Sequence, residues 1–489
     1  MALATPDEPE ITRRALFKER DKVYPKSVKG KFRTLKWTAL ILLLSIYYIT
    51  PWIRWDRGPD APDQAILIDM TGRRAYFFFI EIWPQQVYFL TGILIVAAIG
   101  LFLATSLFGR VWCGYACPQT VWTDLFMWVE RKIEGDRGDR IRLDNGKLSM
   151  PKLRKKVAKH AAWVAISLLT GGAWALYFYD APTLISDIVH FQVTAQATFF
   201  IFLFTGFTYL LAGWAREQVC TYMCPWPRFQ SAMIDEDSLI VTYEGMRGEQ
   251  RRHLKRSESW DDRIASGGGD CIDCGHCVHV CPTGVDIRDG NQLECIGCGL
   301  CVDACNEVMA KIGRPGELIT FDTHNNQLAR ANGDPARTKL VRPRTIVYAL
   351  VLLVVSSAMF AALVLRPRLD ISVLRDRAPL FVVLSTGDIR NGYTFKISNM
   401  TRERKDYGLT FSGVAGADVS VVGLEGDEHL KPVLSAKADT VTTYRIYVKA
   451  PASSVKVAST PLKFELTDLH GGETAKYETV FMAPDGTGR

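Results

Sequence analysis

Five long stretches of the sequence are almost free of charged residues, and the segments between them are strongly polar. Each stretch approaches the ~20 apolar residues that an α-helix needs to cross a bilayer. Tryptophan and tyrosine residues lie near the ends of the stretches, as is typical of side chains at a membrane–water interface. The pattern therefore predicts five membrane-spanning helices, namely Trp37–Ile53, Val87–Phe108, Ala161–Tyr179, Ala197–Ala215 and Thr345–Leu365.

The distribution of basic residues predicts the orientation of these helices. Segment 1–36 and loop 110–160 are rich in lysine and arginine, whereas loop 180–196 contains neither. Because short positively charged loops stay in the cytoplasm, segment 1–36 and loop 110–160 are expected inside. Five crossings then leave segment 366–489 outside. The formal net charge of +7 thus indicates topology, and no nucleic-acid-binding motif accompanies it.

The polar segments differ in composition. Segment 37–244 contains two predicted helical hairpins, and each ends in the same C-x-Y-x-C-P motif, which indicates an internal parallel repeat. Segment 245–269 is charged and ends in glycines, so it is predicted to be a linker, as is segment 313–344. Segment 366–489 alternates apolar and polar residues, for example over 393–398, which predicts an antiparallel β-sandwich.

All twelve cysteines fall into short-spaced groups, which is typical of metal ligands. Segment 270–312 holds eight of them, in two successive C-x2-C-x2-C-x3-C runs. In two-cluster ferredoxins the fourth cysteine of each run binds the other [4Fe–4S] cluster. Zinc can occupy C-x-x-C pairs, but the doubled run fits two clusters better. The predicted ligands are Cys271, Cys274, Cys277 and Cys305 for one cluster, and Cys295, Cys298, Cys301 and Cys281 for the other.

The remaining four cysteines, here called the membrane-surface thiols, are Cys113, Cys117, Cys220 and Cys224. They belong to the two C-x-Y-x-C-P motifs, and i, i+4 spacing places both sulfurs of a pair on one face if the segment is helical. If the hairpins pack as a repeat, the four thiols converge. Soft thiolates suit Cu(I), but the same four could hold a further iron–sulfur cluster or act as a dithiol relay. They could also simply pack the hairpins.

The whole chain resembles the CcoG/FixG/RdxA family of cytochrome c oxidase accessory proteins. The features that carry the resemblance are the two C-x-Y-x-C-P motifs, the doubled ferredoxin run from Cys271 to Cys305, the fifth helix, the cysteine-free β segment and Trp83-Pro84-Gln85. Membrane polyferredoxins of the NapH type share the hairpins and clusters, but the β segment favours the first family.

The resemblance implies a cupric reductase of the bacterial inner membrane that supplies Cu(I) for assembly of cbb-type cytochrome c oxidase. It implies an immunoglobulin-like fold for segment 366–489 and partners among membrane lipid, copper ions, copper chaperones and oxidase assembly factors. The electron donor stays open. Two other interpretations are an electron conduit from a quinol or cytoplasmic donor to a partner enzyme, and an assembly scaffold. The predicted fold class is therefore a multi-domain membrane protein with five helices, a 2[4Fe–4S] ferredoxin-like module and an all-β sandwich.

Overall fold

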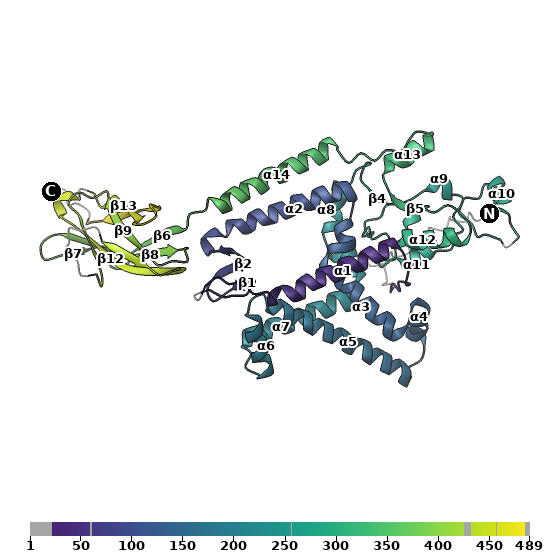
Figure 1. The fold of residues 1–489 in the computed structure, drawn as a ribbon, viewed down its shortest axis with the longest axis horizontal. Helices are drawn as coiled ribbons and strands as arrows, with labels where there is room; N and C mark the ends of the chain where they lie inside the picture. The colour runs from purple at the N-terminus through teal and green to yellow at the C-terminus, as the bar shows by residue number, and fades with distance from the viewer. Residues whose placement is uncertain (1–21, 59–60, 256, 425–431, 456, 485–489) are drawn as a thin grey trace, which may run out of the picture. The chain divides into compact units, whose positions relative to one another are not determined.

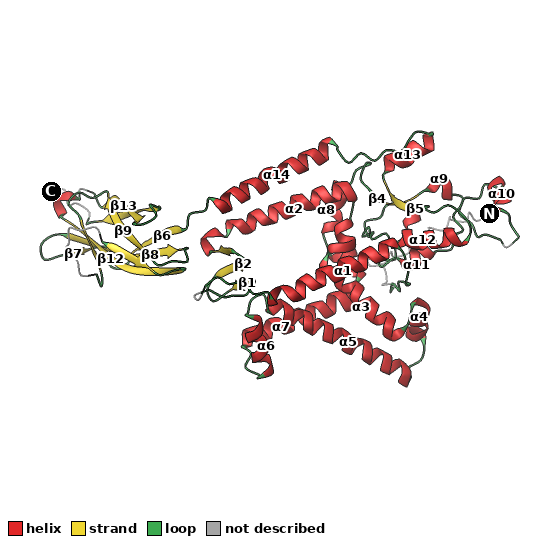
Figure 2. Ribbon diagram, viewed as in Figure 1, coloured by secondary structure: helices red, strands yellow, loops and turns green. Residues whose placement is uncertain are grey.

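The computed structural model describes residues 22–58, 61–255, 257–424, 432–455 and 457–484 (Figure 1). Most of the predicted N-terminal segment 1–36 lies outside the described residues. The chain divides into two compact units, of which one comprises Met1–Ile53 with Ala65–Ser356 and the other comprises Arg54–Gln64 with Ser357–Arg489. The first unit is mainly helical, and the second is mainly β-structure (Figure 2).

Long helices and the segments that join them make up residues 31–233. They are α1 (Lys31–Ile49), η1 (Thr50–Trp52), η2 (Pro84–Gln86), α2 (Tyr88–Phe108), η3 (Trp112–Ala116), α3 (Pro118–Glu134), α4 (Arg137–Asn145), α5 (Met150–Ala175), α6 (Ala181–Val189), α7 (Ala195–Thr208), η4 (Tyr209–Ala215), η5 (Val219–Met223) and α8 (Trp226–Met233). A three-stranded antiparallel sheet, which the sequence did not predict, precedes α2 and consists of β1 (Ile66–Asp69), β2 (Arg74–Phe77) and β3 (Ile80–Ile82).

Four helical segments of the described residues are long and apolar enough to cross a membrane. They are Lys31–Trp52, Pro84–Phe108, Ala195–Ala215 and Pro343–Val364, the last of which is α14. The chain is therefore a membrane protein, but the predicted count of five is not confirmed. The third predicted span, Ala161–Tyr179, coincides largely with α5, whose first turns carry lysines and an arginine that lower its mean hydropathy.

Helices α5 and α7 nevertheless pack closely along each other. A Cβ atom added at Gly171 of α5 would lie 2.5 Å from the carbonyl oxygen of Ile201 in α7. Contacts this close between backbones need a glycine at the crossing point, as is common in membrane helix pairs. Glycine at this position therefore lets α5 lie against a candidate membrane span over its apolar half.

The cysteine-rich module contains short helices and a two-stranded antiparallel sheet. These elements are β4 (Ile240–Tyr243), α9 (Gly245–Gly248), α10 (Trp260–Ala265), α11 (His276–Val280), η6 (Ile287–Asp289), α12 (Leu300–Lys311), β5 (Ile319–Asp322) and α13 (His324–Asn332). Both predicted linkers, 245–269 and 313–344, contain elements of this module. Arg263 of α10 is fully buried, so segment 245–269 packs against the module instead of connecting two parts loosely.

The module is joined to α1 through a carboxylate. Asp303 of α12 accepts hydrogen bonds from the backbone N–H groups of Phe32 (3.2 Å) and Arg33 (2.7 Å), in the first turn of α1. A helix N-terminus leaves such N–H groups without intrahelical partners, and a carboxylate is a favourable acceptor there. Asp303 therefore connects the cysteine-rich module to the first candidate membrane span.

The β part of the second unit is a sandwich of two antiparallel sheets, as predicted. One sheet has the order β10-β12-β8-β6 with β7 beside β8, and the other has the order β11-β9-β13-β14. The strands are β6 (Leu369–Arg375), β7 (Val382–Val383), β8 (Ile389–Asn399), β9 (Lys405–Ser412), β10 (Asp418–Val421), β11 (Val433–Ala436), β12 (Thr440–Ala450), β13 (Ser459–Asp468) and β14 (Thr474–Met482), with η7 (Ala452–Ser454) between β12 and β13.

The alternating pattern of the sequence accounts for the core of this sandwich. Tyr393, Phe395 and Ile397 of β8 are fully buried. The ring of Phe464 from β13 lies 5.4 Å from that of Tyr393 and 5.7 Å from that of Phe395. The period of two along each strand thus brings the inner faces of both sheets together.

Candidate functional site

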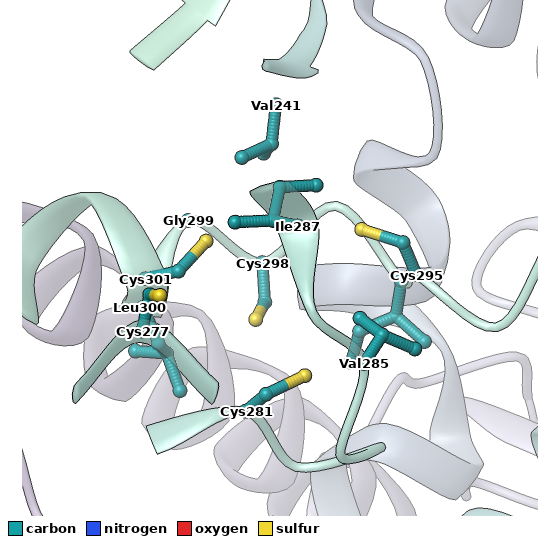
Figure 3. Close-up of a pocket in the computed structure, with 11 residues that line it drawn as sticks. Val241, Cys277, Cys281, Val285, Ile287, Cys295, Cys298, Gly299, Leu300 and Cys301 are labelled. Carbon is teal, nitrogen blue, oxygen red and sulfur yellow. The ribbon is translucent and has the colours of Figure 1, made fainter. Parts of the chain in front are cut away.

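The structure gathers the eight cysteines of the ferredoxin runs around two small cavities. The cysteines that line one cavity are Cys271, Cys274, Cys277 and Cys305. The other cavity is lined by Cys281, Cys295, Cys298 and Cys301, with Cys277 at its edge (Figure 3). Each group combines three cysteines of one run with the fourth of the other, which is the grouping that the spacing predicts.

Helix starts position these side chains. Helix α11 begins after Gly275 and carries Cys277, whereas α12 begins after Gly299 and carries Cys301 and Cys305. Gly299 has φ +72°, and an added Cβ would lie 2.7 Å from the ring of Phe32. Only glycine tolerates both this left-handed backbone and this close packing. Gly299 therefore allows the sharp turn of the loop between Cys298 and Cys301.

The surroundings of the sulfurs fit [4Fe–4S] clusters. Apart from the cysteines, mainly apolar side chains line both cavities. Burial raises the pKa of Cys277, Cys295 and Cys305 to about 12. Nearby backbone N–H groups oppose this rise, because those of Gly297, Leu300 and Ile319 lower the pKa of Cys295, Cys298 and Cys305, respectively. Amide donors of this kind stabilise sulfur that carries negative charge and tune cluster potentials.

Both C-x-Y-x-C-P motifs fold as π-helical turns instead of α-helix. The N–H of Cys117 donates to the carbonyl oxygen of Trp112, and the N–H of Cys224 donates to that of Val219, each at 2.8 Å. The first cysteine of each pair lies inside the turn, and the second ends it with an extended backbone. Single π-turns of this kind occur frequently at functional sites. The two motifs therefore share the same local backbone conformation.

The membrane-surface thiols lie close enough to influence one another. Burial, together with the other thiols of the group, raises the pKa of Cys113 and Cys220 to about 12. Both side chains pack against the apolar cluster that contains Ile296, Cys298 and Leu300. The structure therefore brings two of the membrane-surface thiols, Cys113 and Cys220, next to one ferredoxin loop. In the described part of the chain, no group of three or more His, Cys, Asp or Glu side chains is arranged to hold a single metal ion.

The backbone of the first C-x-Y-x-C-P motif contacts the backbone of the ferredoxin loop that contains Cys298. Tyr115 donates a hydrogen bond of 2.9 Å to the carbonyl oxygen of Cys298. A Cβ atom added at Gly114 would lie 3.0 Å from the carbonyl oxygen of Ile296 and 3.1 Å from the Cα atom of Cys298. The peptide that carries Cys113 and the peptide that carries Cys298 therefore touch without an intervening side chain.

Two polar residues that the sequence reasoning did not identify hold this contact. The guanidinium of Arg110 donates to the carbonyl oxygens of Leu293, Cys295 (3.1 Å) and, from α8, Pro227 (3.0 Å). The thiol of Cys113 donates to Oε1 of Gln230, which is fully buried, at 3.1 Å. An arginine lies shortly before the first cysteine of both motifs, at positions 110 and 216. This repetition is the sequence feature from which a role for Arg110 could have been predicted.

Comparison with protein-family models gives three matches. A 4Fe–4S dicluster domain matches residues 215–324, and a 4Fe–4S binding domain matches residues 90–135. The Ig-like fold at the C-terminus of FixG matches residues 359–484.

Comparison with curated proteins gives relatives over nearly the full chain. The nitrogen fixation protein FixG of Rhizobium meliloti is 47% identical and aligns over 97% of this chain and 95% of its own length. Protein RdxA of Cereibacter sphaeroides is 47% identical over 96% of this chain and 98% of its own length. Protein RdxB of the same organism is 46% identical and aligns over 97% of this chain and 98% of its own length.

Proposed function

Because this chain belongs to the FixG/RdxA family of iron–sulfur oxidoreductases, we propose that it reduces Cu(II) to Cu(I) at the membrane-surface thiols. The observation that carries the proposal is the contact between the peptides of Gly114 and Cys298. This contact places a soft donor set beside a ferredoxin loop. The Cu(I) produced serves the assembly of a cbb-type cytochrome c oxidase, through a copper chaperone or assembly factor.

The chemistry of the thiols favours this substrate. Thiolates are soft ligands that prefer Cu(I), so binding at these residues makes reduction of Cu(II) more favourable. When bound, two [4Fe–4S] clusters supply one-electron reducing equivalents. The protein residues hold the thiols in a shielded position, because Cys113 and Cys220 pack against apolar side chains and Gln230 orients the thiol of Cys113.

The proposed location is the bacterial inner membrane, with the ferredoxin module in the cytoplasm and the β-sandwich in the periplasm. The basic residues of segment 1–36 and loop 110–160 support a cytoplasmic position for the module. The close packing of α5 on α7 supports a fifth crossing, since α5 would pair with a spanning helix over its apolar half.

The test is anaerobic Cu(II) reduction by the purified full chain in detergent. The protein is reduced with dithionite, freed of excess reductant, and mixed with Cu(II) and a Cu(I)-specific chelator. The variants are Cys113→Ala/Cys117→Ala and Cys220→Ala/Cys224→Ala, and Met223→Ala, which lies in the second motif and has an exposed side chain, is the control. Loss of Cu(I) formation in both cysteine pairs, with unchanged iron and sulfide content, supports the proposal. Equal rates in all variants contradict it.

A second candidate function is electron transfer to a partner enzyme, with a further cluster at the membrane-surface thiols. It is favoured by the 4Fe–4S binding model that matches residues 90–135, which include Cys113 and Cys117. The same variants distinguish the two functions. If the thiols hold a further cluster, each double cysteine variant is expected to lose the iron and sulfide of one cluster. If the thiols bind copper instead, no such loss is expected.

A further inference from the structure

A cavity of about 440 Å³ lies beside the second C-x-Y-x-C-P motif. The lining residues come from α3, from α5, from η4 and the two residues that follow it, and from residues 22 and 23. Two of the lining residues, Arg216 and Glu217, connect η4 to the turn that carries Cys220. The cavity is separate from both ferredoxin cavities and has no role in the function proposed above.

Aromatic rings form one side of this cavity. The ring of Trp163 lies 5.3 Å from the imidazole of His160 and 6.4 Å from the ring of Tyr209, both in edge-on arrangements. Trp214, which is 63% exposed, adds a further ring in the last turn of the candidate span Ala195–Ala215. Such rings suit a flat ligand head group, and their position at a span end suits a ligand with an apolar tail.

The charged residues of the cavity are already paired. Glu130 contacts Arg140 (2.9 Å), Arg216 (3.0 Å) and Lys159 (3.4 Å). Lys156 binds a second buried carboxylate, that of Glu134, at 2.9 Å, and Lys22 binds Asp144 at 2.5 Å. An anionic head group would have to displace these carboxylates, at the cost of leaving buried charges unpaired. An uncharged head group with hydroxyl groups fits better.

His160 provides a base for such hydroxyl groups. Its Nδ1 atom and the hydroxyl of Tyr209 are 2.8 Å apart. Burial lowers the pKa of His160, and Lys159 and Lys156 lower it further, so the imidazole is neutral at physiological pH. A neutral imidazole can take a proton from a ligand hydroxyl.

The cavity is also close to the membrane-surface thiols. Cys220 is four positions after Arg216 along the chain, and a step of four residues spans at most about 14 Å even when fully extended. On the other side of the cavity, α3 starts directly after Cys117. The wall that contains Arg216 therefore continues within a few residues into the proposed redox site, and the opposite wall belongs to the helix that begins after Cys117.

We propose that this cavity binds a membrane hydroquinone and oxidises it, which supplies the electrons for the reduction of Cu(II). This inference rests on the function proposed above. One hydroquinone loses two protons and two electrons when its two O–H bonds break, and it becomes a quinone. The two electrons convert two Cu(II) ions to two Cu(I) ions. The protons leave one at a time through His160 to water at the mouth of the cavity.

The test compares decylubiquinol with dithionite as the reductant for anaerobic Cu(I) formation by the full chain. Loss of the base in His160→Gln is expected to lower the quinol-driven rate about a hundredfold. Loss of one hydrogen bond in Tyr209→Phe is expected to lower it about fivefold. Dithionite-driven rates stay unchanged in both variants. Tyr179→Phe is the matched control, since its hydroxyl binds Thr194 beyond the other end of α5.

A binding measurement separates this inference from the copper chemistry. A photoreactive quinone is expected to label peptides of α5 and 209–217, and decylubiquinone is expected to prevent the labelling. Labelling of this kind supports the quinone site even if dithionite-reduced protein fails to reduce copper. Competition by phosphatidylglycerol vesicles alone identifies a lipid head-group site and overturns the inference. Absence of labelling, or equal quinol-driven rates in His160→Gln and wild type, also overturns it.

Discussion

The hydroxyl of Tyr115 donates a 2.9 Å hydrogen bond to the carbonyl oxygen of Cys298, although the two residues are far apart in the sequence. Tyr222 occupies the same place in the second motif, but its side chain is 71% exposed. The two motifs share a π-turn, and yet only the first uses its tyrosine to bind the ferredoxin loop. The sequence repeat is therefore symmetric in its backbone and asymmetric in its contacts.

This asymmetry predicts different effects of the same substitution at the two tyrosines. Tyr115→Phe leaves the carbonyl of Cys298 without this donor, which is expected to cost about 1 kcal/mol of stability and to slow Cu(I) formation. Tyr222→Phe is expected to change neither property. Thermal denaturation in detergent and the dithionite-driven copper assay measure both. Equal behaviour of the two variants would contradict a role for the contact.

Gly114 allows the two peptides to touch, so a methyl group there should separate them. Gly114→Ala places Cβ about 3 Å from backbone atoms of Ile296, Gly297 and Cys298, none of which can move like a flexible side chain. Overpacking of this kind costs roughly 1–3 kcal/mol. The melting temperature of the variant is expected to fall, and its copper reduction to slow. Gly172→Ala, where nothing lies within 4 Å of the added atom, is the control and should retain both.

Arg263 supports the first cysteine of the first ferredoxin run. Its guanidinium donates to the carbonyl oxygens of Gly269 (2.8 Å), Arg252 (2.8 Å) and Cys271 (3.0 Å). The single ammonium group of a lysine cannot reproduce this forked set of guanidinium donors. Arg263→Lys is therefore expected to lower iron and sulfide content towards one cluster per chain, because only the cavity that contains Cys271 is disturbed.

The matched control for Arg263 is Arg251→Lys in the same segment. Arg251 is partly exposed and pairs with the carboxylates of Glu249 and Asp289, which a lysine can also bind. Full iron content is expected in this variant. Loss of iron in both variants, or in neither, would show that the fork of Arg263 does not support the cluster site.

The buried carboxylate of Glu130 makes stability depend on pH in the acid range. Burial alone would raise the pKa of Glu130, but Arg216, Lys159 and Arg140 together hold it at about 2, below the usual 4.5. The stabilisation is therefore complete above pH 4.5 and is lost as the pH falls towards 2.

Glu130→Gln removes this contribution and leaves buried cations without a counter-charge, which is expected to cost roughly 3–5 kcal/mol at neutral pH. The difference in melting temperature between wild type and variant should shrink between pH 4.5 and pH 2. Glu478→Gln, at a side chain that is 78% exposed, is the control and should show little difference at any pH. A difference for Glu130→Gln that stays constant down to pH 2 would contradict the assignment.

The features that the sequence predicted correctly are those set by local spacing. Alternation along β8 and β13 predicted a sandwich because side chains on a strand point to opposite faces. The three-residue spacing of the ferredoxin runs predicted which cysteines gather, since a tight loop brings neighbouring side chains to one centre. The two C-x-Y-x-C-P motifs, which are alike in sequence, also share a π-turn. Conversely, segment 245–269 looked like a linker because its composition is polar, whereas Arg263 satisfies carbonyl groups that lie inside the module.

By itself, the amino-acid sequence thus determined the cysteine groups, four candidate membrane spans and the family, because each depends on residue type and short-range spacing. Only the tertiary structure decided that Gly114 and Tyr115 touch the loop of Cys298, and that His160 and Tyr209 share a cavity beside Arg216. These contacts join residues that are distant along the chain, and they form because packing and buried hydrogen bonds are satisfied only when the whole unit has folded.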